Sequence, residues 1–352
     1  MARLDKLLLG MPATSASDLH VVVGQKPKYR IHGDVVEIED HPVMAETDVK
    51  GYLFEILTEK EQAEYINNKD FDFAYAIEGE ARYRCNYFFQ RTGFGAVFRI
   101  IPEEIMTLDE LNLPPILTHF TNIRSGMVLV TGPTGSGKST SLAAMINHIN
   151  LNERRHIVTI EDPIEFVHKN KKSVIEHREE GNHTVSFATA LRAMIRQDTD
   201  VILVGEMRDL ETISLALSAA AMGSLVYGTL HTNNAPKTID RIIDVFPENQ
   251  QNQVRTLLAE SLRGVVAQLL LRKKHEPGRV AVNEILICNP AVANIIREGK
   301  IERLIDVMQG GKKDGMQIMD EELMRLVDGD IVDGTDAYMN ATDKRRFEHY
   351  LN

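Results

Sequence analysis

The sequence predicts an α/β protein with two units, a small α+β unit and a larger unit built on a mainly parallel sheet. Residues 1–101 carry alternating apolar and polar positions separated by turn signals, the pattern of antiparallel strands. From about residue 126, apolar strand-like runs alternate with helical runs, which is typical of a parallel sheet with helices on both faces. The chain has 352 residues, 43% of them hydrophobic, so two units can each bury a core.

In the first unit, helical spacing is expected at residues 4–9 and 48–65. A turn at Gly33 and Asp34 predicts a hairpin. Apolar or alternating runs predict strands at 21–23, 29–33, 35–38, 71–76, 81–89 and 95–101. This unit is therefore expected to hold an antiparallel sheet over residues 1–101.

A linker is expected at residues 102–125, because this stretch carries three prolines and ends in a short helical run. The second unit, at 126–271, is predicted to contain strands at 127–131, 156–160, 201–205 and 225–230, and helices at 142–149, 187–196 and 210–222. After about residue 271 the pattern becomes helical. Residues 272–352 are therefore expected to form an all-α subdomain.

A glycine-rich loop follows the first strand of the second unit and reads Gly132-Pro-Thr-Gly-Ser-Gly-Lys-Ser-Thr140. It matches G-x-x-x-x-G-K-S between a strand and a helix, a context that an ordinary glycine-rich turn rarely has. The loop N–H groups and the helix N-terminus suit a phosphate, Lys138 is expected to reach the β- and γ-phosphates, and Ser139 is expected to bind Mg²⁺. The predicted nucleoside triphosphate site comprises Gly132, Pro133, Thr134, Gly135, Ser136, Gly137, Lys138, Ser139 and Thr140.

Three more polar loops follow predicted strands, whose carboxyl ends border the ligand crevice in this fold class. The first, Glu161-Asp-Pro-Ile-Glu165, holds three acids that compete for the role of orienting or deprotonating the attacking water. Glu165 is favoured because it lies furthest from the strand, and the other two are expected to support the loop or metal-bound waters.

The second loop follows 201–205, where Gly205 stands in place of the usual terminal aspartate and Glu206 comes next. Glu206 is expected to hold Mg²⁺ through water or to polarise the nucleophile; the alternative is that it caps the following helix. In the third loop, Thr229-Leu-His231-Thr-Asn-Asn234, His231 either senses the γ-phosphate or is an ordinary satisfied side chain.

Arginines mark one face of the predicted antiparallel sheet. Arg82 and Arg84 share a face of one strand, and Arg99 lies on the next. They are either solvated and salt-bridged, or they reach a phosphate bound by another domain or subunit, a task that suits a planar guanidinium.

Composition excludes several classes of protein. The net charge of −11 disfavours a surface that coats nucleic acid or an anionic membrane. Cys85 and Cys288 are isolated, which indicates a reducing compartment without disulfides or zinc. No apolar run approaches the roughly 18 residues of a membrane span, and the N-terminus lacks a signal peptide. A cytoplasmic protein without direct membrane insertion is expected.

Together the four loops resemble the Walker A, Asp box, Walker B and His box of the secretion ATPases, and they are most similar to the PilT branch, the retraction motors of type IV pili. The resemblance covers almost the whole chain. It also includes Ser17-Asp-Leu-His20, Arg82-Tyr-Arg84, residues 95–102 and 235–247, Gly315-Met-Gln317, and Ile296-Arg-Glu-Gly-Lys300, which is similar to the family's AIREGK segment.

The resemblance implies a PAS-like N-terminal domain, a RecA-like P-loop ATPase domain with a helical C-terminal subdomain, and a homohexameric ring that binds ATP and Mg²⁺. It implies Glu165 as general base, Glu206 as Walker B acid and metal ligand with Ser139, and Arg84 and Arg99 as positive charges at the phosphates. His231 would belong to the His box.

The implied function is ATP-driven pilus retraction in twitching motility, with the motor docked on the inner-membrane platform protein of the pilus machine and hence peripheral at that membrane. Two alternatives remain open: an accessory retraction ATPase that depends on a second motor, and a weakly hydrolysing regulator or scaffold. A hexameric helicase is disfavoured by the acidic charge and the lack of a basic, aromatic-rich stretch.

The chain departs from the family pattern at Ser224, where a second His-box histidine is usual, and after about Asp330, where no family pattern is followed. It also lacks the extra N-terminal domain and the paired-CxxC insertion of assembly and type II relatives, which favours the retraction branch. A hinge is expected over residues 101–113, between the two core-forming units.

Overall fold

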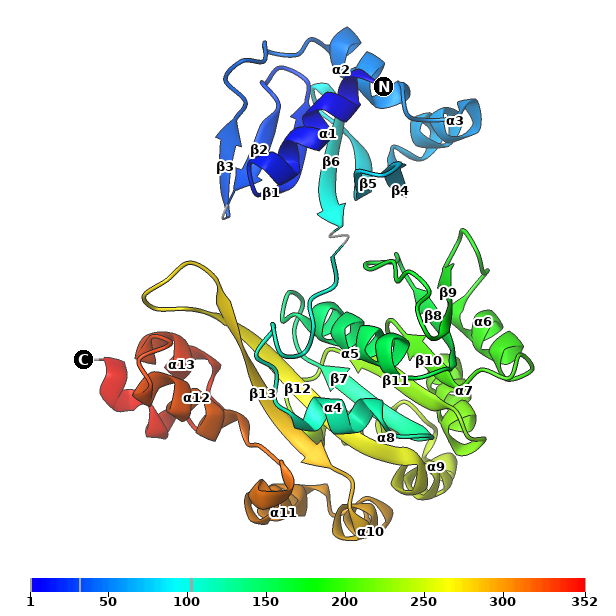
Figure 1. The fold of residues 1–352 in the computed structure, drawn as a ribbon, viewed down its shortest axis with the longest axis vertical. Helices are drawn as coiled ribbons and strands as arrows, with labels where there is room; N and C mark the ends of the chain where they lie inside the picture. Colours follow the sequence, from blue (N-terminus) through cyan, green and yellow to red (C-terminus); the bar gives the residue numbers. More distant parts are fainter. Residues whose placement is uncertain (1, 32, 102–103, 352) are drawn as a thin grey trace. The chain divides into compact units, whose positions relative to one another are not determined.

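The computed structural model describes residues 2–31, 33–101 and 104–351. The chain divides into two compact units, Met1–Glu104 and Ile105–Asn352. Part of the predicted linker, at 102–103, lies outside the described residues. Each unit has its own sheet and its own core, so each is described by itself (Figure 1).

The first unit is a six-stranded antiparallel sheet in the order β3-β2-β1-β6-β5-β4. Its strands are β1 (Ala16–Val22), β2 (Lys28–Ile31), β3 (Asp34–Glu37), β4 (Asp70–Ile77), β5 (Ala81–Gln90) and β6 (Gly93–Ile101), and its helices are α1 (Arg3–Ala13), α2 (Glu46–Phe54) and α3 (Glu59–Asn68). The single helix predicted over 48–65 is wrong, because Thr58 starts a new helix by accepting a hydrogen bond from the Glu61 N–H.

The second unit has a seven-stranded sheet in the order β13-β12-β7-β11-β10-β8-β9. The strands are β7 (Gly126–Thr131), β8 (His156–Glu161), β9 (Val174–Glu179), β10 (Val201–Val204), β11 (Leu225–Leu230), β12 (Leu262–Arg272) and β13 (Arg279–Ile287). All neighbours pair in parallel except β12 and β13, which form an antiparallel hairpin. The predicted fold class is confirmed.

Helices cover both faces of this sheet (Figure 1). One face carries α4 (Ile116–Thr121) and α5 (Lys138–Asn152). The other face carries α6 (Phe187–Met194), α7 (Leu210–Ala221), α8 (Ala235–Asp244), α9 (Glu248–Ser261), α10 (Pro290–Glu298) and α11 (Leu304–Gly310). Burial on both faces explains why these strands read as continuous apolar runs rather than alternating ones.

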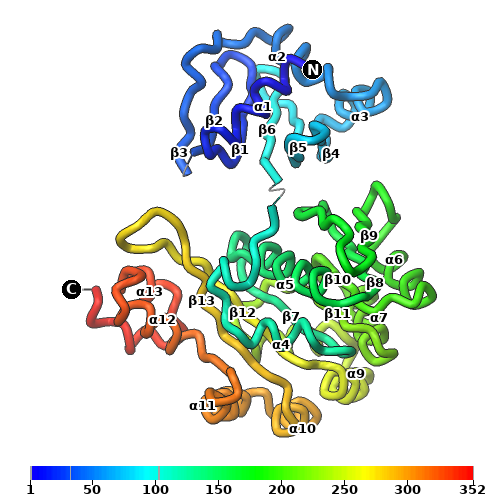
Figure 2. Tube along the Cα trace, in the orientation of Figure 1, coloured from blue at the N-terminus to red at the C-terminus, as the bar shows by residue number. Residues whose placement is uncertain are grey.

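The expectation of helices alone after residue 271 is wrong for β13, which was missed because its inner residues 282–286 are all buried and show no alternation. Beyond it, α12 (Met319–Asp328) and α13 (Gly334–Asn340) pack beside the β12–β13 hairpin, at the red end of the tube in Figure 2. Short 3₁₀ turns complete this region at Ile301–Arg303, Lys312–Asp314, Lys344–Arg346 and Glu348–Leu351.

The segment that precedes β7 is anchored to the second unit. Leu108, Leu113, Leu117 and Phe120 are buried in its core, so the later half of the predicted hinge is packed against the sheet. The hinge therefore stays a prediction only for residues before Leu108.

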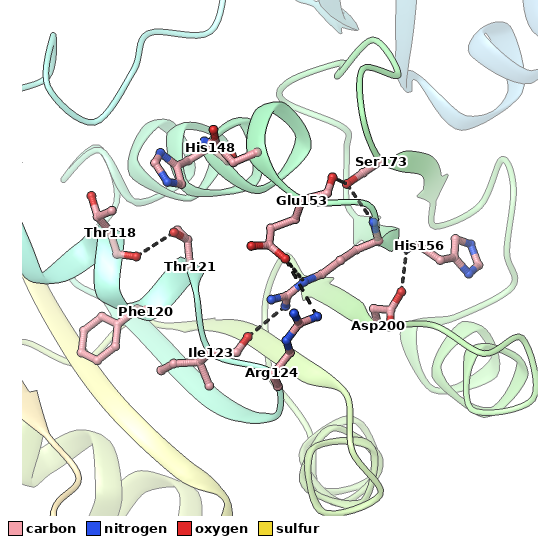
Figure 3. Close-up of polar contacts among 12 residues, drawn as sticks. Thr118, Phe120, Thr121, Ile123, Arg124, His148, Glu153, His156, Ser173 and Asp200 are labelled. Carbon is pink, nitrogen blue, oxygen red and sulfur yellow. Dashed lines mark hydrogen bonds and ion pairs between the residues drawn. The ribbon is translucent and has the colours of Figure 1, made fainter.

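A polar cluster fastens the same segment at the amino ends of the strands (Figure 3). Arg155 is buried and donates from Nη1 to the Ile123 carbonyl at 2.9 Å, while its Nε lies 3.5 Å from the Glu153 carboxylate. Ser173 donates to the Glu153 carbonyl, and Asp200 accepts from the His156 N–H at 2.8 Å. This edge of the sheet is thus tied to the loop after α4 by side-chain contacts.

Across residues 2–31, 33–101 and 104–351, no helix combines the length and the apolar character needed to cross a bilayer.

Gly264 of β12 tests how tightly α4 packs on the sheet. A Cβ at this position would lie 2.3 Å from Cζ of the buried Phe120. We expect Gly264→Ala to lower the free energy of unfolding by about 2 kcal/mol, measured by chemical denaturation. Adding Phe120→Leu should recover part of that loss, because the two residues share one contact. Gly310→Ala, where a Cβ meets open space, is the control. If the effects of Gly264→Ala and Phe120→Leu were fully additive, the predicted clash would be contradicted.

Candidate nucleotide site

The glycine-rich loop leaves β7 at a point where no side chain fits. Gly132 has φ +144°, and a Cβ there would lie 2.2 Å from the Gln268 carbonyl oxygen of β12. Gly135 and Gly137 also have positive φ, +79° and +85°. These conformations favour glycine, and they let the loop curl over the N-terminus of α5, a backbone arrangement that suits an anion.

Lys138, the first residue of α5, folds back over the loop. Its ammonium donates to the carbonyls of Gly132 at 2.8 Å and Pro133 at 3.1 Å. Burial lowers the pKa of Lys138, while the carboxylates of Glu206 and Glu165 act in the opposite direction. The three predicted residues therefore share one electrostatic environment.

The loops after β7, β8, β10 and β11 meet at one edge of the sheet, as the sequence predicted. The register pairs Val204 with Ile160 and Leu230 with Thr131, so the strands end together. Ser139 lines a cavity here together with Leu142 and Ala143 of its own helix and with residues from the other three strands and the loops after them: Glu161, Phe166, His168, Leu203, Gly205 and Thr229.

The loop after β8 separates its two glutamates. Glu165 is exposed, whereas Glu161 is only 9% exposed and accepts a hydrogen bond from the Glu165 N–H at 3.3 Å. Burial raises the pKa of Glu161 to about 7, opposed by hydrogen bonds from Thr159 and the Glu165 backbone. Glu161 thus has a partly protonated carboxyl near neutral pH, while Glu165 is open to solvent, where an attacking water would arrive.

The loop after β10 presents a charged carboxylate. Glu206 Oε2 accepts from Arg208 at 2.7 Å, and Glu206 Oε1 lies 3.2 Å from His231 Nε2. The Arg208 hydrogen bond lowers the pKa of Glu206, against the effect of its burial. Gly205 approaches the backbone of the β8 end so closely that a Cβ would lie 3.0 Å from the Ile160 carbonyl, which explains glycine at the usual aspartate position.

His231 is half exposed and reaches Glu206 from the end of β11. Thr229, on the same strand, donates to the Gly205 carbonyl, which ties this strand end to the Glu206 loop. Ser224 lies at the opposite end of β11 and donates to the Thr199 carbonyl at 2.8 Å. The family departure at Ser224 is therefore remote from the edge that carries Lys138.

The predicted arginines lie in the first unit, on the face of the sheet away from the buried tyrosines of β5. Arg99 faces Arg84 across the β5–β6 pair and Asp18 across the β1–β6 pair. Its Nε donates to Asp18 at 2.8 Å, and Arg84 is exposed. Arg82 Nε is buried without a hydrogen-bond partner among the described residues. Of the two alternatives, the salt bridge is the one that Arg99 makes in this structure. A contact of these arginines with phosphate remains a prediction.

Residues without any motif support the site. Glu179 of β9 accepts from the Ile164 N–H at 3.0 Å, and His177, also on β9, accepts from the His168 N–H at 3.0 Å. Both contacts hold the loop after β8 in place. They were missed because β9 was not predicted: residues 174–179 read Val-Ile-Glu-His-Arg-Glu and show no apolar–polar alternation. Gln268 was missed because nothing near it in the sequence relates it to the loop.

Within the described residues, no group of three or more histidines, cysteines or acids is arranged to hold a metal. In phosphate sites, Mg²⁺ is usually bound by one or two protein oxygens together with phosphate oxygens and water. Ser139 and Glu206 fit that role chemically, since they offer a hydroxyl and an ionised carboxylate.

Comparison with known proteins gives consistent matches. The family model of the type II/IV secretion system protein matches residues 2–277. The twitching motility protein of Neisseria gonorrhoeae is 50% identical, with 91% of this chain and 86% of that protein covered. The type IV pilus retraction ATPase PilT of Pseudomonas aeruginosa is 46% identical, over 92% and 94%. A crystal structure of the pilus retraction motor PilT with bound ADP aligns with a TM-score of 0.92 at 42% identity, covering 99% of both chains.

The pKa of Glu161 predicts a pH effect on stability. The pKa is raised from 4.5 to about 7 on folding, so the stability contributed by neutral Glu161 is fully present below about pH 4.5 and is lost as the pH rises through about 7. The side chain of Glu161→Gln cannot ionise, so the variant should not lose this stability. Its free energy of unfolding, relative to that of the wild type, should therefore increase by about 2–3 kcal/mol as the pH rises from 5 to 8.

The measurement is the midpoint of thermal unfolding across that pH range, where the variant should gain on the order of 5 °C relative to the wild type. Asp162→Asn, at an exposed position, is the control and should show no such gain. If the unfolding midpoints of Glu161→Gln and the wild type changed with pH in the same way, the raised pKa of Glu161 would be contradicted.

Proposed function

Because the chain belongs to the family of type II/IV secretion system proteins and is an ATPase of that family, we propose that it is the motor that retracts a type IV pilus. The observation that carries the proposal is the convergence of Lys138, Glu165 and Glu206 at one strand edge, in a chain similar to retraction ATPases over nearly its whole length. Hydrolysis would supply the work of retraction.

The nucleotide would bind with its phosphates over the glycine-rich loop, where the N-terminus of α5 and the loop N–H groups favour negative charge. Lys138 would exchange its two neutral carbonyl partners for charged phosphate oxygens, so that both the donor and the acceptor of each hydrogen bond carry charge. Ser139 and Glu206 would hold Mg²⁺, which neutralises charge that develops on the phosphates.

Glu165 would act as general base toward the attacking water. Its exposure gives water access, and the neighbouring acid, Glu161, is buried beneath the loop. Glu206 is held by Arg208 and His231, so a change in either contact would move the carboxylate. His231 would in this way report the state of the γ-phosphate through Glu206.

Arg84 and Arg99 would supply further positive charge to the phosphates in a homohexameric ring. Arg99 would have to leave or share Asp18 to do so, since that carboxylate holds its Nε in the isolated chain. The ring would dock on the inner-membrane platform protein of the pilus machine and would lie in the cytoplasm, peripheral to that membrane. Residues 296–300, on α10 and the turn after it, are the nominated segment for retraction.

The first test is steady-state ATP hydrolysis with the oligomer mass recorded. We expect Lys138→Ala to lose ATP binding, and Glu165→Gln to bind ATP as a hexamer while its turnover falls at least about 100-fold, because general-base catalysis is removed. Glu260→Gln, at an exposed position of α9, is the control. Turnover that persists in Glu165→Gln would assign the base to another residue.

The second test is twitching in a type IV piliated host that lacks its own retraction ATPase. The wild-type chain should restore retraction, and Glu165→Gln should not. The chain could instead form an active hexamer that restores retraction only when a second motor is also present. That result would make the chain an accessory ATPase and overturn the proposal in its stated form.

A further inference from the structure

Gln268 of β12 approaches both ends of the glycine-rich loop, with its backbone at Gly132 and its side-chain amide at Ser136 and Gly137. It is 2% exposed. The β12 strand continues past the end of β7: Ala267 pairs with Thr131, so Gln268 stands beside Gly132. A Cβ on Gly137 would lie 2.9 Å from Gln268 Nε2. The Gln268 backbone therefore lies against the first glycine of the loop, and its side-chain amide lies beside the last one.

Both polar atoms of this amide are used. Nε2 donates to the Ser136 carbonyl at 2.7 Å, and Oε1 accepts from the Ser141 hydroxyl at 2.8 Å. Ser136 and Ser141 are 3% and 2% exposed, so both bonds are shielded from water. A flipped amide would set its oxygen against the Ser136 carbonyl oxygen, so Ser141 and the carbonyl together select one orientation.

The bond to Ser136 has a direct consequence for the phosphate site. The Ser136–Gly137 peptide is trans, and in a trans peptide the N–H points opposite to the C=O. Holding the Ser136 oxygen against Gln268 turns the Gly137 N–H away from β12, to the open side of the loop. That N–H belongs to the set that meets a phosphate at the start of α5.

We propose that Gln268 is a positioning residue for nucleotide binding: it fixes the Ser136–Gly137 peptide so that its N–H is aimed at the β-phosphate of ATP or ADP. This inference rests on the proposed nucleotide site. It makes the affinity of the loop depend on a strand about 130 residues later in the sequence, within the same sheet. Ser141 keeps the amide in register.

Three variants separate the parts of this arrangement. Gln268→Met keeps the length of the side chain and removes both bonds. Gln268→Glu keeps the acceptor for Ser141 and replaces the donor to the Ser136 carbonyl by an oxygen that repels it. Ser141→Ala leaves the donor in place and removes only its anchor. The matched control is Asn283→Leu, a buried amide on β13 directly across from Gln268, whose Oδ1 has no hydrogen-bond partner among the described residues.

The readout is the dissociation constant for ATP and for ADP by calorimetry with the full chain, beside the melting temperature without nucleotide. We expect about tenfold weaker binding of both nucleotides in Gln268→Met, a larger loss in Gln268→Glu, and a smaller one in Ser141→Ala. Asn283→Leu should bind both nucleotides as the wild type does. The KM for ATP should rise more than kcat falls.

The outcomes distinguish this inference from the proposed function. Wild-type affinity in Gln268→Met and Gln268→Glu, whatever their melting temperatures, would overturn the positioning role while leaving the ATPase intact. Equal losses in Asn283→Leu and Gln268→Met would also overturn it, because the effect would then come from the hairpin and not from the amide. A wild-type chain that binds neither ATP nor ADP would instead overturn the nucleotide site itself.

Discussion

The buried strand β7 is the constraint on which the site depends. All six of its residues are buried between β11 and β12, so its end at Thr131 has a fixed place and direction. The chain must turn there against the Gln268 backbone, and only glycine fits at 132. The same burial aligns the ends of β8, β10 and β11, because parallel pairing with a fixed register leaves each strand a single position. The loop geometry is thus a result of sheet packing more than of the loop itself.

The second feature is the separation of the acids by environment. Glu161 ends β8 and Glu206 comes shortly after the neighbouring β10, yet burial keeps the Glu161 carboxyl partly protonated near pH 7 while Arg208 favours the ionised form of Glu206. Only an ionised carboxylate can attract Mg²⁺ or a proton donor, so the two acids suit different tasks. Glu165 differs from both in being exposed to solvent. Three acids of one chemical type thereby occupy one edge without equivalent roles.

The carboxyl and amino ends of the strands in the second unit carry different kinds of polar contact. At the carboxyl edge, Lys138 contacts the glycine-rich loop and His231 contacts Glu206. At the amino edge, Arg155 pairs with Glu153 and donates to the loop after α4, and Asp200 accepts from the His156 N–H (Figure 3).

The sequence by itself determined the fold class, the strand–loop–helix of the nucleotide loop and the family, because a glycine-rich loop in fixed spacing and a period of apolar residues are local signals. Most strands and helices follow from them. The tertiary structure decided what depends on partners far along the chain: β9 and β13 exist through pairing, Glu161 differs from Glu165 through burial, and Gln268 reaches the loop only because β12 lies beside β7. Such contacts leave no local pattern, since the free energy that selects them comes from neighbours supplied by the fold.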